Sequence, residues 1–471
     1  MGRSREHILV SYMLEIIHIF FRETGMDKKS AVIQMSKMLL HDTNFQVRHR
    51  VNPKYFTRKR VLMFSIVLVL ILQKSVKSLQ LVLNEFFGVL SMCGSLSVLT
   101  VSNSAFSQAR QKLSHTAFIE LHRTAVVETY YADDQYQTWQ GFRLIAVDGS
   151  KIRLPDTPEI RKEFGTSRVA NQSGADLGEQ PWGLASVCYD LLNEISLDAI
   201  LAHGRAYEVD VAIKHLPYLQ TNDLIMGDMN YPSYRFIAEL SVLRQQRGCH
   251  FLFRCSSGSF TPARELFANA ERESLIVTLT VPKHKRREIK RLGLPRQLTV
   301  RFVRVVLDDG TVEVLVTSLL DETRYPTPIF KELYNLRWGI ETLYDRIKNL
   351  LTLENFSGTT VEAVKQDFYA TIFLCGLEAV LTEDANAILA SKTPQNRYPQ
   401  QVNKMVSFNT LKNHVIALLI SDEPASEVCA KLTRLFLTNP VCVRKDRQVA
   451  RKKTSSRAAL HYQTRKRKFC Y

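Results

Sequence analysis

Three carboxylates in the sequence are placed where they could do chemistry together. Asp148 closes the apolar run Phe142–Val147, Asp228 closes a second apolar run, and Glu341 lies in a helical pattern further along the chain. A single Asp at the end of a strand is most often a turn former. The three together predict oxygen ligands for Mg²⁺, which proteins hold with one or two carboxylates plus a substrate phosphate. Two such ions can promote in-line attack on a phosphodiester.

A helix after Pro328 must position Glu341. Its apolar residues recur every three or four positions and predict a face packed on a core: Leu333, Leu336, Ile340, Leu343, Ile347 and Leu350. On a wheel of about 100° per residue, Tyr334, Arg337, Glu341 and Lys348 share one arc opposite this stripe. Alone, such an arc is most often a solvated charged face. Because Asp148 and Asp228 are also present in the sequence, we favour a catalytic role for this arc over a solvated face.

Composition limits the class of protein and of partner. The chain has 471 residues, of which 45% are hydrophobic and 23% charged, values that exclude a fibrous or largely disordered protein. The net charge of +17 favours a polyanionic partner, most commonly nucleic acid. Residues 441–471 form a basic tail, which either follows a DNA backbone or is a disordered, solvated arm.

The cysteines and the longest apolar run argue against a zinc site and a membrane span. None of the eight cysteines forms a C-x-x-C pair or stands with His at zinc spacing, so we expect reduced thiols in a cytoplasm. The run from Val61 to Leu72 is shorter than the roughly 20 residues that a bilayer needs, and it predicts a buried core helix.

The order of the elements predicts an α/β core interrupted by a β subdomain. We expect strands at Phe142–Val147 and Lys151–Leu154, joined by a turn at Asp148-Gly149-Ser150, and at Leu184–Leu191 and Ile195–Leu201. A helix over Tyr207–Leu219 precedes the strand that ends at Asp228. Phe251–Leu320 is predicted to be mostly β, with a hairpin of Leu298–Leu307 and Thr311–Leu320.

These elements group into five regions along the chain. They are a helical DNA end-binding region (1–132), the first part of the core (133–240), a β-rich insertion (241–325), the second part of the core with C-terminal helices (326–440) and the basic tail (441–471).

A short helix near residue 105 could read DNA. Ser102-Asn103-Ser104 supplies N-cap residues, and the predicted exposed side then carries Gln108, Arg110, Gln111 and Lys112. A capped, basic, amide-rich helix fits the major groove. The alternative is a solvated helix face.

The motifs together resemble a known family. Asp148 in Ala-Val-Asp-Gly-Ser, Asp228 in Gly-Asp-Met-Asn-Tyr-Pro-Ser-Tyr, and Tyr334-x2-Arg337-x3-Glu341-x6-Lys348 are similar to the DDE transposases of bacterial insertion sequences, in particular the insertion sequence four family. The resemblance implies an α/β fold: an RNase H-like catalytic core with an inserted β subdomain, after an all-α DNA-binding region. It also implies that Asp148, Asp228 and Glu341 bind Mg²⁺, with Mn²⁺ as a substitute.

The resemblance further implies partners and side-chain roles. The partners are the terminal inverted repeats of the element and target DNA, bound by a dimer in a synaptic complex of the bacterial cytoplasm and nucleoid. Arg337 and Lys348 are expected to grip phosphates near the cut, and Tyr334 to hydrogen-bond the same backbone. Trp338 either stacks on an unpaired base or packs in the core.

Two departures from the family leave a hairpin intermediate open. Asp345 replaces a second basic residue found in some relatives, and Arg346 points elsewhere on the wheel. Residues 229–330 hold no Trp. The sequence therefore predicts a transposase that cuts at transposon ends and joins the 3′-hydroxyls to target DNA. The alternatives are a structure-selective nuclease on the same core and a DNA-binding protein that has lost catalysis.

Overall fold

The protein is described here from a computed structural model in which the chain divides into two compact units. The structure describes residues 26–58, 60–73, 77–92, 100–170, 176–392 and 397–444. Unit 1 comprises Met1–Gln135, Arg153–Trp182 and Ile347–Tyr471, and unit 2 comprises Tyr136–Ile152 and Gly183–Arg346. The region boundaries expected from the sequence stay predictions. Most of the basic tail, from residue 445 on, lies outside the described residues.

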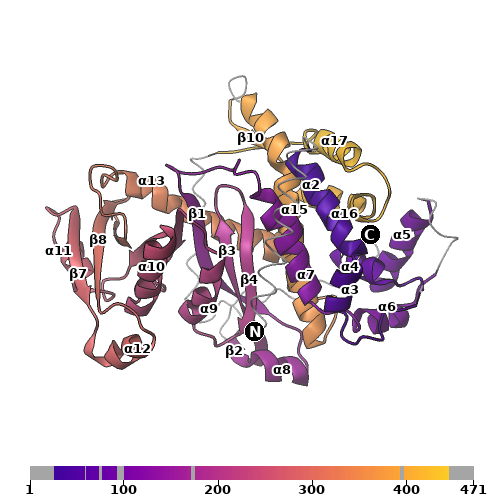
Figure 1. Ribbon diagram of the computed structural model, residues 1–471, viewed down its shortest axis with the longest axis horizontal. Coiled ribbons are helices and arrows are strands. Elements are labelled where there is room, and N and C mark those ends of the chain that lie inside the picture. Colours follow the sequence, from indigo (N-terminus) through magenta and orange to yellow (C-terminus); the bar gives the residue numbers. More distant parts are fainter. Residues whose placement is uncertain are drawn as a thin grey trace. The chain divides into compact units, whose positions relative to one another are not determined.

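Unit 1 is mainly helical. Its helices are α2 (Lys28–His41), α3 (Thr43–His49), α4 (Phe64–Leu72), α5 (Leu79–Met92), α6 (Asn103–Arg110), α7 (Thr116–Leu121), η1 (His122–Glu128), α8 (Pro158–Phe164), α15 (Val361–Ser391), α16 (Lys404–Leu419) and α17 (Ala425–Phe436). The short strands β10 (Gln400–Gln401) and β11 (Val441–Cys442) pair antiparallel. The long helix α15 contacts α2, α4, α7, α16 and α17 and forms the centre of the unit (Figure 1).

The predictions of a buried core helix and of a capping Ser102 in unit 1 are confirmed. Every residue of α4 is buried, as expected of a core helix in this apolar run. No helix in the described ranges has the length and apolarity to span a bilayer. Ser102 caps α6 by accepting a hydrogen bond from the backbone N–H of Ala105.

Unit 2 is built around a large mixed sheet. Its strands are β1 (Arg143–Arg153), β3 (Asp176–Asp190), β4 (Ile195–His203), β5 (Asp223–Gly227), β6 (His250–Cys255), β7 (Ser274–Thr280), β8 (Gln297–Val306) and β9 (Val312–Thr317). Their order across the described part of the sheet is β4-β3-β1-β5-β6-β9-β8-β7. β5 and β6 run parallel to β1, and β9, β8 and β7 continue the sheet antiparallel. In unit 1, β2 (Thr166–Ala170) pairs with the first part of β3.

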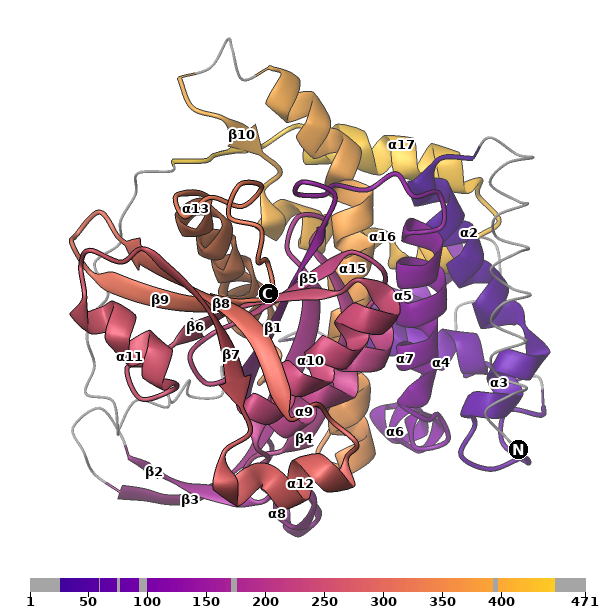
Figure 2. The same cartoon turned by 60° about the vertical axis from the view of Figure 1, so that its left-hand side comes forward.

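The helices of unit 2 connect and cover these strands (Figure 2). They are α9 (Glu208–His215), η2 (Leu216–Tyr218), α10 (Tyr234–Arg247), α11 (Thr261–Ala268), η3 (Lys283–Lys285), α12 (Arg286–Arg291), α13 (Ile329–Asn335), η4 (Leu336–Trp338) and α14 (Gly339–Asp345). The helix predicted after Pro328 is confirmed, with a 3₁₀ turn (η4) between α13 and α14. A π-helical segment, η5 (Arg346–Leu350), follows α14.

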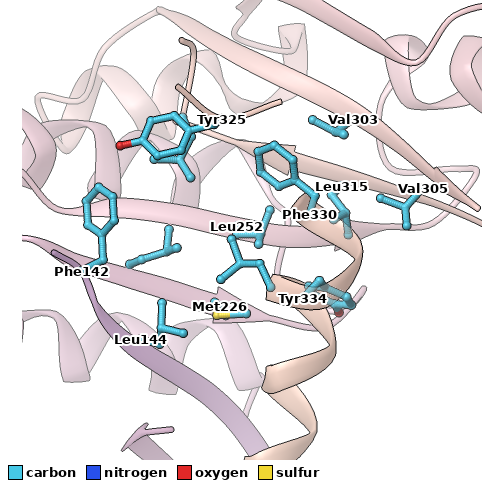
Figure 3. Close-up of a cluster of buried hydrophobic side chains, with 13 residues drawn as sticks. Phe142, Leu144, Met226, Leu252, Val303, Val305, Leu315, Tyr325, Phe330 and Tyr334 are labelled. Carbon is cyan, nitrogen blue, oxygen red and sulfur yellow. The ribbon is translucent and has the colours of Figure 1, made fainter. Parts of the chain in front are cut away.

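One buried cluster joins the sheet to α13 (Figure 3). Leu144 of β1, Met226 of β5 and Leu252 of β6 lie under Phe330 and Tyr334 of α13. The strands are almost continuously apolar here because they are covered by other elements. The cluster fixes α13, and with it the start of the helical run that carries Glu341, over β1, which contains Asp148, and β5, which Asp228 follows.

The strand predictions at Leu184–Leu191 and Ile195–Leu201 and the hairpin after residue 297 are confirmed by β3, β4, β8 and β9. The prediction of a turn at Asp148-Gly149-Ser150 is wrong, because β1 continues through these residues from Arg143 to Arg153. Pairing with β3 outweighs the local turn propensity of these residues. The prediction of mostly β structure over 251–320 is also corrected, since α11 and α12 interrupt that region.

The prediction of reduced thiols is confirmed for the cysteines that the structure describes. Cys188, Cys249, Cys255, Cys375 and Cys429 are buried free thiols, and Cys442 is an exposed free thiol.

Candidate active site

Asp148 and Asp228 lie at the same edge of two neighbouring parallel strands. β1 and β5 pair from Arg143 with Asp223 to Ala146 with Met226. Asp148 therefore lies just beyond the last pair on β1, and Asp228 directly follows β5. Both residues follow the paired segment of two parallel strands in the same direction, so the two carboxylates come together in unit 2, as their positions predicted. Both side chains are half-buried.

Two further side chains that the sequence did not single out join this pair. A Cβ built on Gly149 would lie 3.1 Å from Cγ and Cδ of Glu208, so the Glu208 side chain lies against the backbone beside Asp148. Tyr231 is fully buried, and its hydroxyl finds no hydrogen-bond partner among the described residues. Glu208 begins α9, whereas Asp148 and Asp228 were selected because each closes an apolar run.

The pKa values report how close these groups are. Burial, and next the negative charge of Asp228, raise the pKa of Asp148 to about 7. Burial and the charge of Asp228 also raise the pKa of Glu208. Burial and the charge of Asp148 raise the pKa of Tyr231 well above its usual range. These carboxylates therefore repel one another, and a bound cation would relieve that repulsion.

Two glycines allow the backbone to approach so closely. A Cβ on Gly149 would also meet the side chain of Leu184 at 3.1 Å. A Cβ on Gly227, directly before Asp228, would lie 3.0 Å from the ring of Tyr231 and 3.2 Å from that of Phe253. A side chain at either position would push on residues that surround the carboxylates.

Glu341 is connected to the pair through Arg337. Nη2 of Arg337 donates a hydrogen bond to Oε1 of Glu341 at 2.9 Å. The guanidinium lies 5.6 Å from the ring centroids of both Tyr334 and Trp338, at cation–π distance. The charge of Arg337 also acts on Asp148 and partly opposes the rise in its pKa, so the guanidinium that binds Glu341 lies near Asp148 as well.

The solvated charged face that the helical wheel allowed for this arc is wrong for Tyr334 and Arg337, whereas the side chain of Glu341 is 35% exposed. Arg337 is only 2% exposed and Tyr334 only 4%. The hydroxyl of Tyr334 donates to the carbonyl oxygen of Gly227 at 3.3 Å, which joins the helix to the strand end before Asp228. Trp338, by contrast, is 41% exposed. The DNA contacts predicted for Tyr334, Arg337 and Trp338 stay predictions.

Helix α14 is fixed to the same strands. The hydroxyl of Tyr344 lies 2.8 Å from the carbonyl oxygen of Asp148 and 3.0 Å from that of Ala185. Arg346, which the wheel placed away from the site, forms a two-point ion pair with Glu194 at 2.8 and 2.9 Å. The helix that carries Glu341 is thus held in place at its C-terminal end.

Helix α9 is anchored by a buried polar chain. Nε2 of His215 lies 3.0 Å from Oγ of Ser186 on β3, and its Nδ1 lies 2.6 Å from Asp198 on β4. His215 and Ser186 are buried and beyond the reach of a substrate. This Ser–His–Asp chain therefore holds α9, and Glu208 at its start, against the sheet.

The third carboxylate does not complete a metal-binding group in this structure. Within the described ranges, no three His, Cys, Asp or Glu side chains lie close enough together to hold a metal ion. Lys348 belongs to unit 1, where its positive charge lies beside Glu354. The ligand role of Glu341 and the phosphate contact of Lys348 stay predictions.

Unit 1 holds a second group of predicted residues. A groove of ≈ 1130 Å³ lies between residues 53–62 and α6, and both Gln108 and Lys112 line it. Its other cationic lining residues are Lys54, Arg58 and Arg60, and no Asp or Glu is among the described residues that line it. Lys112 lies over the ring of Tyr55 at 5.8 Å.

The exposed position predicted for Arg110 is wrong. Arg110 is 5% exposed, and its Nη2 forms an ion pair with Asp367 of α15 at 2.7 Å. Its other nitrogens donate to Gln366 at 2.6 Å and to Ser357 at 2.7 Å. The wheel of α6 could not reveal this, because the covering helix lies more than 250 residues further along the chain. Arg110 therefore holds α6 and cannot reach a base.

Arg337→Lys is expected to reduce DNA cleavage at least about tenfold, because Lys keeps the charge but loses the planar fork that positions Glu341. The melting temperature should stay close to wild type. Arg161→Lys is the matched control, since it alters an Arg–carboxylate ion pair with Asp156 in unit 1, and it should cut normally. If Arg337→Lys cleaves DNA like the wild type, the Arg337–Glu341 contact is a structural ion pair with no role in cleavage.

The comparisons with known proteins agree with this geometry. Residues 139–375, half of the chain, match the family model described as "Transposase DDE domain". The matched part contains Asp148, Asp228 and Glu341. The chain belongs to the family of transposases with a DDE domain.

Two transposases of Escherichia coli are similar to this chain. The chain is 26% identical to the transposase InsG for insertion sequence element IS4 of Escherichia coli (strain K12), over 59% of this chain and 60% of that protein. It is 29% identical to the putative transposase InsZ of the same organism, over 34% of this chain and 52% of that protein. The predicted resemblance to the insertion sequence four family is confirmed. The chain thus spans about 60% of the length of the first relative.

A solved structure of piggyBac transposase in a synaptic complex with hairpin DNA is also similar. The identity is 11% and the TM-score 0.41, with 94% of this chain and 88% of that chain covered.

Proposed function

We propose that this chain is a DNA transposase. It binds the terminal inverted repeats of an insertion sequence, cuts at the ends and joins the 3′-hydroxyls to target DNA. The observation that carries the proposal is the meeting of Asp148 and Asp228 at one edge of β1 and β5, with Glu341 bound to the Arg337 that lies beside them. All three lie in the part that matches the DDE domain model.

The strand arrangement supports an RNase H-like core. β3 and β4 form an antiparallel pair on one side of β1, and β5 and β6 run parallel to β1 on its other side. β7, β8 and β9 with α11 and α12 then form the inserted subdomain between Asp228 and Glu341. We infer that the core acts from the edge where β5 ends beside Asp148 of β1.

The residues at that edge fit a hard divalent cation. Asp148 and Asp228 supply oxygen ligands, and the buried, unpartnered hydroxyl of Tyr231 can donate to a water in the same place. One or two carboxylates plus a DNA phosphate are a usual set for Mg²⁺, and Mn²⁺ accepts the same donors. Such an ion would stabilise charge on the attacked phosphate.

The side chains of the site would have distinct tasks. Asp148, Asp228 and Glu341 would hold the cations, and Arg337 orients Glu341. Trp338, exposed beside Arg337, would stack on a base near the cut. Lys348 would contact a phosphate of the bound DNA. Tyr334 and Tyr344 keep the helix on the strand ends.

We assign end recognition to the groove of unit 1. It combines an amide, Gln108, with the cations Lys54, Arg58, Arg60 and Lys112. A DNA duplex is read by amide and cationic side chains on its bases and held by cations on its phosphates. The assignment keeps 1–132 as the end-binding region. A dimer in a synaptic complex, acting on DNA in the bacterial nucleoid, is part of the same proposal.

Gln108→Ala is expected to weaken binding to the cognate repeat, relative to a random duplex, by about 1–3 kcal/mol, because it removes a base contact. Lys112→Ala should weaken binding to both DNAs equally, since it removes a phosphate contact. Fluorescence anisotropy with both duplexes measures this difference. If both variants lose the same binding affinity for the cognate repeat as for the random duplex, the groove contacts only the DNA backbone.

The raised pKa of Asp148 makes metal binding dependent on pH. The cation needs the ionised carboxylate, so below pH 7 a proton must first leave, and affinity should fall by about tenfold per pH unit for this one proton. Without metal the sign is opposite: the stability contributed by neutral Asp148 is lost as pH rises through about 7. The rise in melting temperature on adding Mg²⁺ should therefore be larger at pH 8 than at pH 6. Asp148→Asn should lose this difference, and an equal rise at both pH values would contradict it.

A strand-transfer assay separates the proposal from a nuclease. Precut end DNA with a free 3′-hydroxyl is incubated with a supercoiled target plasmid and Mg²⁺. A transposase joins the end to the plasmid, whereas a nuclease on the same core cuts DNA and joins none. A protein that binds ends without cutting or joining would be a DNA-binding descendant that has lost catalysis.

A further inference from the structure

The segment between β7 and β8 is strongly basic and exposed. It consists of η3, α12 and the residues that follow, and α12 lies at one end of this hairpin (Figures 1 and 2). We name its seven exposed cations the α12 patch: Lys283, Lys285, Arg286, Arg287, Lys290, Arg291 and Arg296. Glu288 carries the one negative charge of residues 281–296.

Glu288 does not neutralise the α12 patch. Its oxygens are bound by Lys285 at 2.9 Å and by Arg235 of α10 at 3.4 Å. No carboxylate of the described ranges forms an ion pair with the other six cations. Ile289 is the buried residue of α12, so Arg287 and Arg291, two positions to either side, point away from the body of unit 2.

The α12 patch lies near the edge that carries the carboxylates. Arg235, in the first turn of α10, contacts Glu288 at 3.4 Å and Asp210 at 3.0 Å. Asp210 shares the first turn of α9 with Glu208, whose side chain lies against Gly149. α10 itself begins six residues after Asp228. A line of contacts thus leads from the aspartate pair across the starts of α9 and α10 to the α12 patch.

We propose that the α12 patch binds the sugar–phosphate backbone of duplex DNA that extends from the carboxylate site. The proposal rests on the proposed function, because it takes the DNA to be held at Asp148 and Asp228. Uncompensated Arg and Lys side chains repel one another, and phosphates spaced along a duplex relieve that repulsion while releasing counterions. No base contact is involved, so the surface accepts any sequence.

The test compares two variants that each remove two positive charges. Arg287→Gln/Arg291→Gln alters the α12 patch. Arg264→Gln/Arg272→Gln alters two exposed cations elsewhere in the same insertion and is the control. Binding is measured against salt concentration on two DNAs, a transposon end and a random duplex that represents target. The patch variant should lower the log–log salt slope by about 1.8, or about 0.9 for each lost phosphate contact.

The two DNAs identify which duplex the patch holds. If the salt slope falls only with the transposon end, the α12 patch binds the end. If it falls only with the random duplex, the patch binds target DNA. If it falls with both DNAs, the patch binds any duplex. Unchanged slopes on both DNAs, or an equal change in the control variant, overturn the proposal. Neither result depends on catalysis. Failure of the wild type to cut or join would instead overturn the proposed function, and the two failures stay distinguishable.

Discussion

Asp148→Asn, Asp228→Asn and Glu341→Gln should each leave end binding nearly intact and lower Mg²⁺-dependent nicking by roughly two orders of magnitude or more, as expected when one transition-state contact is removed. Each change keeps the shape of the side chain and removes the charge that holds a cation. In metal-free protein, Asp148→Asn should also relieve repulsion from Asp228, so its melting temperature should not fall. Nicking of an end duplex and anisotropy on the same DNA measure the two effects.

Asp345→Asn is the control for the carboxylate variants. Asp345 lies on α14 with Glu341 but is exposed. Its variant should nick like wild type. Near-normal nicking by any of the three test variants would remove that residue from the catalytic site, and for Glu341 it would leave a site of two aspartates.

Arg110→Ala should destabilise the protein by about 3–5 kcal/mol, because it leaves a buried carboxylate without its partner. Asp367 is fully buried at the side chain, and the Arg110 guanidinium supplies an ion pair at 2.7 Å. Folded Arg110→Ala protein should still distinguish the cognate repeat from random DNA. Urea unfolding followed by circular dichroism measures the loss.

Two further variants isolate the cause. Gln108→Ala, on the exposed side of the same helix, should change stability by less than about 0.5 kcal/mol. Replacing both partners, as in Arg110→Met/Asp367→Leu, should recover much of the loss, since no charge stays buried alone. If Arg110→Ala instead folds stably and loses repeat discrimination, Arg110 reads DNA after all.

The periodicity of the sequence predicted elements well and their surroundings poorly. The spacing of Tyr334, Arg337 and Glu341 placed them on one side of a helix, because a helical repeat is a local property. It could not say that Tyr334 and Arg337 are buried, since the strand ends that cover them come from other parts of the chain. The error for Arg110 has the same origin: its partner lies on α15.

The two aspartates were found because each closes an apolar run, whereas Glu208 begins α9 and was not selected by that criterion. Tyr231 gave no such signal. Its importance comes from a hydroxyl that is buried without a partner, and burial of one atom depends on the packed structure. The turn predicted after Asp148 failed because pairing within the sheet decided the local conformation.

The glycines beside the aspartates bear on how a gene of this kind decays. A single base change that converts Gly227 to Ala would press a methyl group into the buried ring of Tyr231, which lies 3.0 Å from that position. Gly149 is constrained in the same way by Glu208 and Leu184. A mutated copy of the gene could thus keep all three acidic codons and still encode an inactive protein. When functional copies of such a gene are distinguished from inactive ones in a genome, the two glycine codons should be checked together with the three acidic codons.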